Sequence, residues 1–278
     1  PLSSYCFSAL TSTYTHVSSS LITPTSGTTW GGGGTYDDCW YPSIPIGFTF
    51  HYNCDSFTNM CASQNCWVVL GQTLPGSVVW TFDNDLSNTV ISGVGAFNLP
   101  RPILAPLWSD IMSSGDCLRY ETTGSAPNRV FKLEWYNIGF WGSSSSGLES
   151  VELILYEGTN VIEFAYDFLS SGSYADGLCS IGITGGSGAY PQSGTQPFWS
   201  LNGTGSSPTP SMTTDDKTLS GQPASNQVYR WDPNCSGTPT PGTVTVTDSA
   251  ECTSYTSTLS VPTCVPMCIT FQWQSSSD

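Results

Sequence analysis

The sequence predicts an all-β chain, built as an antiparallel, jelly-roll-like β-sandwich with a second, partial β domain behind it. Apolar and polar residues alternate over short runs separated by turn residues, which is the period of a strand, and no helical period is sustained. Charged residues make up only 10% of the chain, so hydroxyl, amide and glycine residues must supply its polar surface. This composition is typical of extracellular β proteins.

The first strong alternation covers residues 44–52, where Ile44, Ile46, Phe48 and Phe50 share one face. Residues 129–138 alternate in the same way and place Leu133 and Trp135 on one face. The other predicted strands are shorter: 65–70, 77–82, 148–156, 161–168 and 227–233.

The clearest hairpin joins residues 148–156 to residues 161–168 through the turn-forming tetrapeptide Glu-Gly-Thr-Asn at 157–160. If the preceding strand pairs with this hairpin, Lys132 lies near Glu152 or Glu163 on the solvent face. Such a cross-strand pair contributes about 0.2–1 kcal/mol and mainly marks the register.

Two stretches are predicted as loops or linkers: the serine run 143–146, and 202–225, which is rich in Gly, Pro, Ser and Thr. After residue 233 the pattern changes to alternating Thr and Val. We therefore place a domain boundary near 233–236, between a β-sandwich domain of residues 1–233 and an incomplete β domain of residues 234–278.

The net charge is −15, from 21 acidic and 6 basic residues. A nucleic-acid footprint needs clustered Lys and Arg, and an anionic membrane attracts basic segments, so neither partner is expected. No apolar run reaches the length of a membrane span, and the chain starts at Pro1 without a visible signal peptide. An exported protein would be represented here in processed or trimmed form.

The chain has 11 cysteines and 2 histidines. No two cysteines form a C-x₂-C pair, which disfavours a zinc site. Scattered cysteines in a Lys-poor, hydroxyl-rich chain indicate disulfides made in an oxidising compartment. Because the number is odd, at least one thiol is free, pairs between chains, or has its partner outside this sequence.

Several segments occur in a distinctive order: "PSIPIGFTFHYN…FTNMCASQNCWVVLG", "LPRPILAPLWSDI", "APNRVFKLEWYNI" and "ESVELILYEGTNVIEFAYDF". This order resembles a β-sandwich domain of large secreted cell-surface and adhesin proteins of Bacteroidota, many of which are type IX secretion substrates. The resemblance covers roughly residues 1–233 and is most distinctive at 106–110 and 127–164. It implies an extracellular or cell-surface protein.

Residues 234–278 resemble the opening of an immunoglobulin-like repeat found in the same proteins. The segment Phe271-Gln272-Trp273-Gln274 matches a strand of such repeats, whose tryptophan packs in the sandwich core. About three strands are present where such a sandwich needs about seven. Either the natural chain continues past Asp278, or a strand from another chain completes the sheet.

The chain departs from the family pattern at two turns. Where the family has Asn-Gly, this sequence has Asn53-Cys54 and Asn65-Cys66. Glycine suits such turns because it accepts positive φ without strain. The departure suggests a disulfide in place of the turn chemistry, between Cys54 and Cys66 or through Cys61.

We find no nucleophile elbow, dinucleotide-binding loop, Walker motif or zinc-protease motif. His16 and His51 are therefore interpreted as structural residues, and the chain is not expected to be an enzyme. No cofactor is expected except calcium, for which Asp83, Asn84 and Asp85 are the candidate ligands. The alternative for this cluster, and for the acidic pair at 37–38, is a polar turn.

Glycosylation is expected more than catalysis. Asn202 and Asn234 open N-x-S/T patterns, and Ser249 lies in an Asp-Ser-apolar pattern that resembles the O-glycosylation motif of the same bacterial group. Trp30 and Trp141 are the tryptophans most expected to be exposed for glycan contact.

These observations favour a non-enzymatic structural or adhesive surface protein, whose partners are other copies of itself or neighbouring domains of a longer chain. It is a candidate subunit of a fibre or filament assembled head-to-tail by β-strand complementation, in which Tyr5 and Phe7 belong to the donor strand and Phe271 and Trp273 to the accepting domain. The simpler alternative for Tyr5 and Phe7 is the first strand of their own domain. The rival function is a carbohydrate-binding module of a larger adhesin or enzyme.

Overall fold

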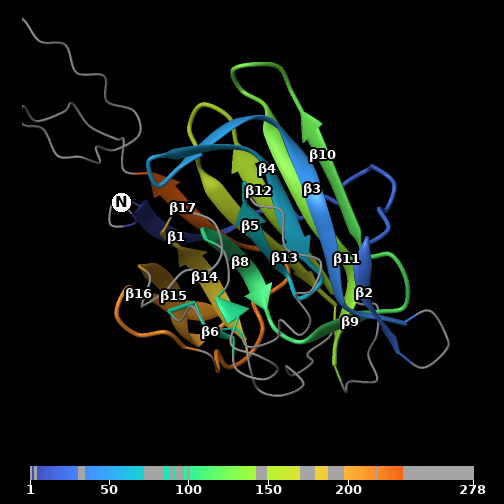
Figure 1. Cartoon of the computed structure of the whole chain (residues 1–278). Coiled ribbons are helices and arrows are strands. Elements are labelled where there is room, and N and C mark those ends of the chain that lie inside the picture. Colours follow the sequence, from blue (N-terminus) through green and yellow to red (C-terminus); the bar gives the residue numbers. More distant parts are fainter. Residues whose placement is uncertain are drawn as a thin grey trace, which may run out of the picture.

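A computed structural model describes residues 2, 5–30, 35–71, 84, 86–87, 90–91, 97–98, 101–141, 149–169, 179–186, 197–216 and 218–233. These residues are nearly all β and form two antiparallel layers packed face to face (Figure 1). The predicted all-β, sandwich-like fold is confirmed. The predicted second domain, with Asn234, Ser249, Phe271 and Trp273, lies outside the described residues.

The first layer contains the central hairpin and the N-terminal strand. Each neighbouring pair in it is antiparallel. In spatial order its strands are β1 (Tyr5–Thr11), β17 (Gln227–Pro233), β13 (Ile162–Phe168), β12 (Glu149–Tyr156), β11 (Val130–Phe140) and β10 (Leu118–Thr123).

The second layer is also antiparallel. In spatial order its strands are β16 (Ser207–Ser211), β15 (Phe198–Thr204), β14 (Ser180–Thr184), β8 (Ile103–Trp108), β5 (Trp67–Leu70), β4 (Asp55–Ser63), β3 (Thr35–Tyr52) and β9 (Ile111–Ser113), with β2 (Ser26–Trp30) also beside β3. The end of β11 pairs with β9, so the two layers are continuous on that side and the sandwich is nearly barrel-shaped. The short strands β6 (Val90–Ile91) and β7 (Phe97–Asn98) pair separately.

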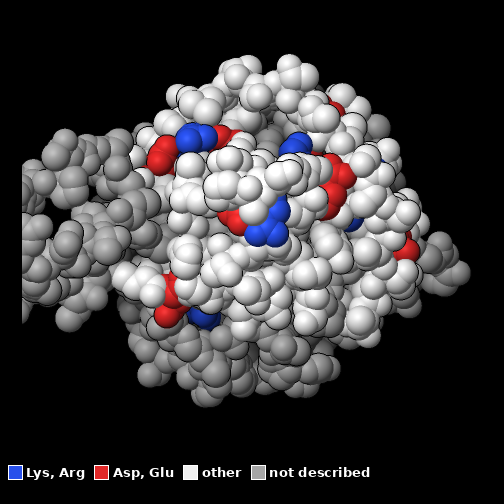
Figure 2. Space-filling model, turned by 90° about the horizontal axis from the view of Figure 1, so that it is seen from above, with Lys and Arg blue, Asp and Glu red and all other residues white. Residues whose placement is uncertain are grey.

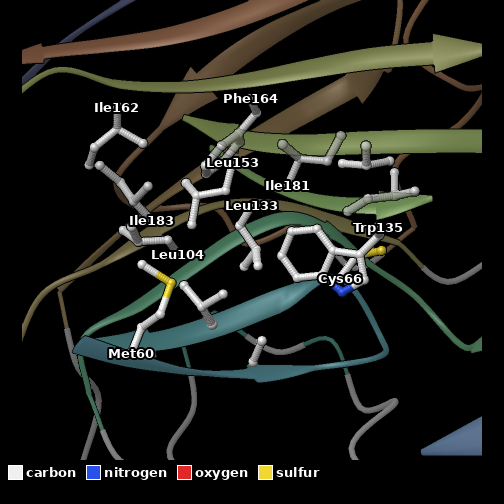
Figure 3. Packing of buried hydrophobic residues seen from close by; sticks show 14 of the residues in the cluster. Met60, Cys66, Leu104, Leu133, Trp135, Leu153, Ile162, Phe164, Ile181 and Ile183 are labelled. Atoms are coloured by element: carbon white, nitrogen blue, oxygen red, sulfur yellow. The ribbon is translucent and has the colours of Figure 1, made fainter. Parts of the chain in front are cut away.

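The core lies between the layers and follows from the alternation in the strands. Leu133 and Trp135 of β11 face Met60 of β4 and Leu104 of β8 (Figure 3). Trp135 is fully buried, and its indole Nε1 donates a hydrogen bond to the Ser63 carbonyl oxygen of the opposite layer at 2.8 Å. Each fully buried large side chain contributes roughly 1.5–3 kcal/mol to folding.

Most predicted strands are confirmed. The ends of β5, β11, β12, β13 and β17 lie within about two residues of the predicted ones, whereas β3 contains the predicted strand 44–52 but already begins at Thr35. The turn at 157–160 is also confirmed, because Gly158 has φ 78° and Asn160 has φ 54°. The predicted strand 77–82 and the serine run lie outside the described residues.

The prediction of a loop or linker over 202–225 is wrong in part. Its beginning completes β15, and β16 pairs with β15 in the register Leu201↔Pro210 and Gly203↔Pro208. Proline lacks an N–H and is tolerated in a strand only where no partner needs that donor. Because β16 is the last strand of its layer, its prolines disrupt no hydrogen-bond ladder beyond it.

The N-terminal stretch forms β1 in its own domain, paired with β17 in the register Tyr5↔Pro233 and Phe7↔Trp231. Tyr5 is buried, and the Phe7 ring lies 5.3 Å from the Trp231 ring. The simpler of the two predicted roles for Tyr5 and Phe7 is thus the one the structure shows. β1 is the edge strand of the first layer.

Candidate functional site

The outer face of the first layer carries a group of paired charged side chains. The register places Arg119, Glu134 and Glu152 in one row across β10, β11 and β12. Side chains of adjacent residues on a strand point to opposite faces. Because Leu133 and Trp135 point into the core, Glu134 between them points outward.

Residues 12–22, here called the crossing segment, cover this face. Ser12 N–H donates to the Asn226 carbonyl oxygen beside β17, and Ile22 forms a bridge with Leu118 at the start of β10. The segment therefore runs across the layer from one edge region to the other. Its Tyr14 ring packs on the small outer apolar cluster of Ile154, Ala165 and Val228.

Glu134 is the centre of the charged group. Its side chain is fully buried, between the sheet and the crossing segment. The carboxylate accepts hydrogen bonds from Tyr14 Oη at 3.1 Å, from Val17 N–H at 3.0 Å and from Arg119 Nε at 2.6 Å, and His16 Nδ1 lies 2.6 Å away. A buried carboxylate needs such partners, because its ionised form is otherwise expensive.

Glu152 lies directly opposite Glu134 on the neighbouring strand. Its Oε2 accepts a hydrogen bond from Lys132 Nζ at 3.0 Å, and its side chain is 1% exposed. Its other oxygen, Oε1, is buried and has no hydrogen-bond partner. Burial raises the pKa of Glu152 to about 7, and the neighbouring Glu134 charge adds to this increase, while Lys132 opposes it.

The contact between Lys132 and Glu152 is one of the two pairs predicted from the hairpin. Lys132 Nζ also donates to the Thr15 carbonyl oxygen at 3.0 Å, so the crossing segment covers this amine as well. The other predicted acid, Glu163, is taken instead by Arg230, with Nη1 2.7 Å from Oε1.

The remaining described basic residues also have hydrogen-bond acceptors within the protein. Arg129 makes a forked ion pair with Glu157, and Arg101 is fully buried and donates to the Leu86 carbonyl oxygen at 3.2 Å. On the face seen in Figure 2, the coloured groups are small and most of them contain both signs. The described basic side chains thus have their acceptors within the protein.

The comparisons with known proteins add a family. The profile of the family described as NIDO related matches residues 4–233. The chain belongs to the NIDO-related family. A NIDO-related domain is typical of extracellular, adhesion-type proteins. No curated protein and no solved structure matches the chain.

The NIDO-related domain of this chain does not contain the predicted disulfide. Cys66 is a free, fully buried thiol beside Trp135 in the core (Figure 3), and Cys61 is not disulfide-bonded. Cys54 is exposed at the turn between β3 and β4 and is disulfide-bonded, but neither Cys61 nor Cys66 is its partner, because neither of them is disulfide-bonded. The expected turn conformation is nevertheless present, because Cys54 has φ 75° and Cys66 has φ 56°.

The calcium prediction rests on residues that are mostly undescribed. Asp83 and Asp85 lie outside the described residues, while Asn84 is buried and its Nδ2 lies 3.4 Å from Ser180 Oγ. Within the described ranges, no group of three or more His, Cys, Asp or Glu residues could hold a metal ion.

The acidic pair before Cys39 is buried rather than part of an exposed turn. Asp38 Oδ1 accepts a hydrogen bond from Asn65 Nδ2 at 2.8 Å, whereas Asp37 Oδ1 is buried without a hydrogen-bond partner. Burial and the Asp38 charge raise the pKa of Asp37 to about 6.

The predicted glycan-related residues are half-buried where they are described. Asn202 lies on β15, and its Nδ2 donates to the Thr214 carbonyl oxygen at 3.2 Å. Trp141 is half-buried, and the side chain of Trp30 lies outside the described set. Among tryptophans whose side chains are described, none is exposed.

His51 contacts Ser56 at 2.8 Å between Nδ1 and Oγ. Both residues are exposed and face each other across the β3–β4 hairpin, in the register His51↔Ser56. His16 lies instead in the charged network, and its ring packs edge-on against Tyr14 and Tyr136. No helix in the described residues is long and apolar enough to cross a membrane.

Sequence reasoning missed Glu134 and the crossing segment. One signal was available: Lys132, Glu134 and Tyr136 alternate with core residues on a predicted strand, which marks them as one outer face. The cover over that face comes from residues more than a hundred positions away, and no local pattern announces such a contact.

Proposed function

We propose that this chain is a non-enzymatic structural and adhesive module of an extracellular surface protein. Membership of the NIDO-related family over residues 4–233 carries this proposal. The charged network supports it, because its ionised groups are paired with one another and lie under the crossing segment instead of opening onto a substrate site. Export by a type IX secretion system, which the sequence resemblance implies, belongs to the same proposal.

The finer part of the proposal is assembly into fibres by strand exchange. β1 lies at the edge of its layer, and only β17 among the described strands pairs with it. Most of its side chains are exposed, and its attachment to the core relies on Tyr5 and Phe7. An edge strand held by so few core contacts can be donated to another copy at modest cost.

The experiment is negative-stain electron microscopy of the purified full chain before and after β1 is locked in place. A Leu10→Cys, Val228→Cys pair in a Cys6→Ser background links β1 to β17, because Leu10 and Val228 face each other in the register. We expect filaments from the reduced double variant and isolated particles from the oxidised one. The Leu10→Cys single variant in the same background is the control and should behave alike in both states.

Filaments that persist after oxidation would show that assembly does not use β1, and an absence of filaments from every reduced form would contradict assembly altogether. Carbohydrate binding is the alternative function, and a glycan array with the same protein tests it. Uniform non-binding supports the structural proposal, while saturable binding of one glycan class supports the alternative.

A further inference from the structure

Lys132 and Glu152 meet in a setting that favours more than an ion pair. Lys132 Nζ is 3.0 Å from Glu152 Oε2, and both groups project from adjacent antiparallel strands. In an exposed ion pair of this kind, water solvates both charged groups and the interaction between them is weak. Here the acid is 1% exposed and the crossing segment contacts the amine, so water has little access to the acid.

The surroundings of Glu152 favour its neutral, protonated form, which is the form that can react with an amine. Its second oxygen has no hydrogen-bond partner, so Lys132 alone donates a hydrogen bond to this carboxylate among the described residues. The Glu134 carboxylate faces it directly across the strand pair, and a second negative charge there favours the neutral acid. The Glu134 carboxylate in turn accepts hydrogen bonds from Arg119 Nε and from the backbone N–H of Val17, which fix its position.

We propose that Lys132 and Glu152 form an intramolecular amide bond that covalently joins β11 to β12. In the first step the ammonium of Lys132 passes a proton to Glu152, which converts the ion pair into a neutral amine and a neutral acid. The amine then attacks Glu152 Cδ, the Cδ–O bond breaks, and a second proton from the nitrogen leaves with that oxygen as water. One ammonium and one carboxylate thus become one amide and one water, with no change of oxidation state.

Proximity supplies the driving force. Amide formation in water is opposed by hydrolysis, but well-oriented groups react with effective molarities of about 10⁵–10⁸ M, far above the concentration of water. The Thr15 carbonyl oxygen accepts a hydrogen bond from Lys132 Nζ and so helps to hold the amine beside the acid. Glu134 contacts neither reacting atom in this step. It acts as a positioning residue, because its negative charge favours the protonated form of Glu152.

The test is the intact mass of the full chain, expressed without glycosylation and measured after denaturation and reduction. We expect a mass lower than that of the bare polypeptide by one water molecule, and a branched tryptic peptide that joins the β11 and β12 sequences through Lys132 and Glu152. Lys132→Arg keeps the cation and the ion pair but removes the nucleophile, so it should restore the full mass.

Glu163→Gln is the matched control, since this neighbouring acid pairs with Arg230 and its loss should leave the mass deficit in place. Glu134→Gln should slow or abolish the deficit. A wild-type chain at full mass after prolonged incubation at neutral pH would overturn the proposal. A deficit that persists in Lys132→Arg would also overturn it, because the water would then be lost elsewhere. The measurement is independent of any adhesive activity.

Discussion

Glu134 shows how one residue can organise a surface. It accepts hydrogen bonds from β10 and from the crossing segment while its own strand forms part of the sandwich. Replacing it by alanine leaves the Arg119 guanidinium, which is 15% exposed, without its carboxylate. Removing one partner of a buried pair typically costs about 3–5 kcal/mol. We therefore expect Glu134→Ala to lower the free energy of unfolding by an amount in this range.

Urea denaturation followed by far-ultraviolet circular dichroism measures this change. Glu163→Ala is the comparison, because its partner Arg230 is 30% exposed and also contacts Asp232 at 3.0 Å. Its effect should be clearly smaller, since water and a second acid can replace Glu163. Equal losses in the two variants would show that burial of the network does not determine its energetic weight.

Asp37 should make stability depend on pH in the unusual direction for a carboxyl group. Its pKa rises from 3.8 to about 6 in the folded chain, so between these values the folded state binds more protons than the unfolded state. Stability from this group therefore falls as pH increases through that window and stays low above it. Asp37→Asn should remove a penalty on the order of 1–3 kcal/mol at neutral pH and give no such gain near pH 3.8.

Thermal unfolding of wild type and variant across the pH range checks this expectation. Glu157 gives a contrast of opposite sign, because the hydrogen bonds from Arg129 lower its pKa. The stability that Glu157 contributes is present above its ordinary pKa and is lost as pH falls. If Asp37→Asn instead destabilised the chain at neutral pH, the ionised Asp37 carboxylate would stabilise the folded state, and the expectation would be wrong.

At the scale of elements, the sequence predicts the central strands of a layer far better than its edge strands. The period of β11 and of the β12–β13 hairpin is readable because one face is buried and the other is polar. β16 was not readable, since its SPTPS sequence has no apolar alternation and contains two prolines. An edge strand pairs on only one side, so it can form without apolar alternation and can contain prolines on its unpaired side.

The crossing segment provides the element-scale prediction. Asn226 has φ 66°, and its Oδ1 accepts a hydrogen bond from Tyr14 N–H at 2.9 Å. Asn226→Gly keeps the left-handed backbone and removes only this acceptor, whereas Asn226→Ala also adds strain of about 1–2 kcal/mol. Both variants should speed hydrogen–deuterium exchange in residues 12–17, and only the alanine variant should show a clear loss of global stability. Unchanged exchange at Tyr14 would contradict this role of Asn226.

At the scale of the whole molecule, the contacts that sequence patterns missed are those between distant segments. The bonds from Tyr14, His16 and Val17 to Glu134 span between 117 and 120 residues, and the indole Nε1 of Trp199 donates to the Leu2 carbonyl oxygen across 197 residues. Periodicity reports which face of a strand is buried, but it does not report what covers the opposite face. The all-β class and the core were therefore predictable, and the candidate site was predictable only in its Lys132–Glu152 pair.

Contacts between distant segments also determine which truncated fragments of the chain can fold. β17 lies between β1 and β13, and Trp231 is fully buried with its ring 4.6 Å from that of Phe164. A fragment of residues 1–233 keeps this strand, so under reducing conditions we expect it to unfold in one cooperative transition. A fragment of residues 1–226 lacks it, leaves β1 without its partner and should be insoluble or unfolded. Urea titrations followed by circular dichroism distinguish the two. A 1–233 fragment that failed to fold would show that residues 234–278 contribute to the core of the sandwich, and would move the domain boundary.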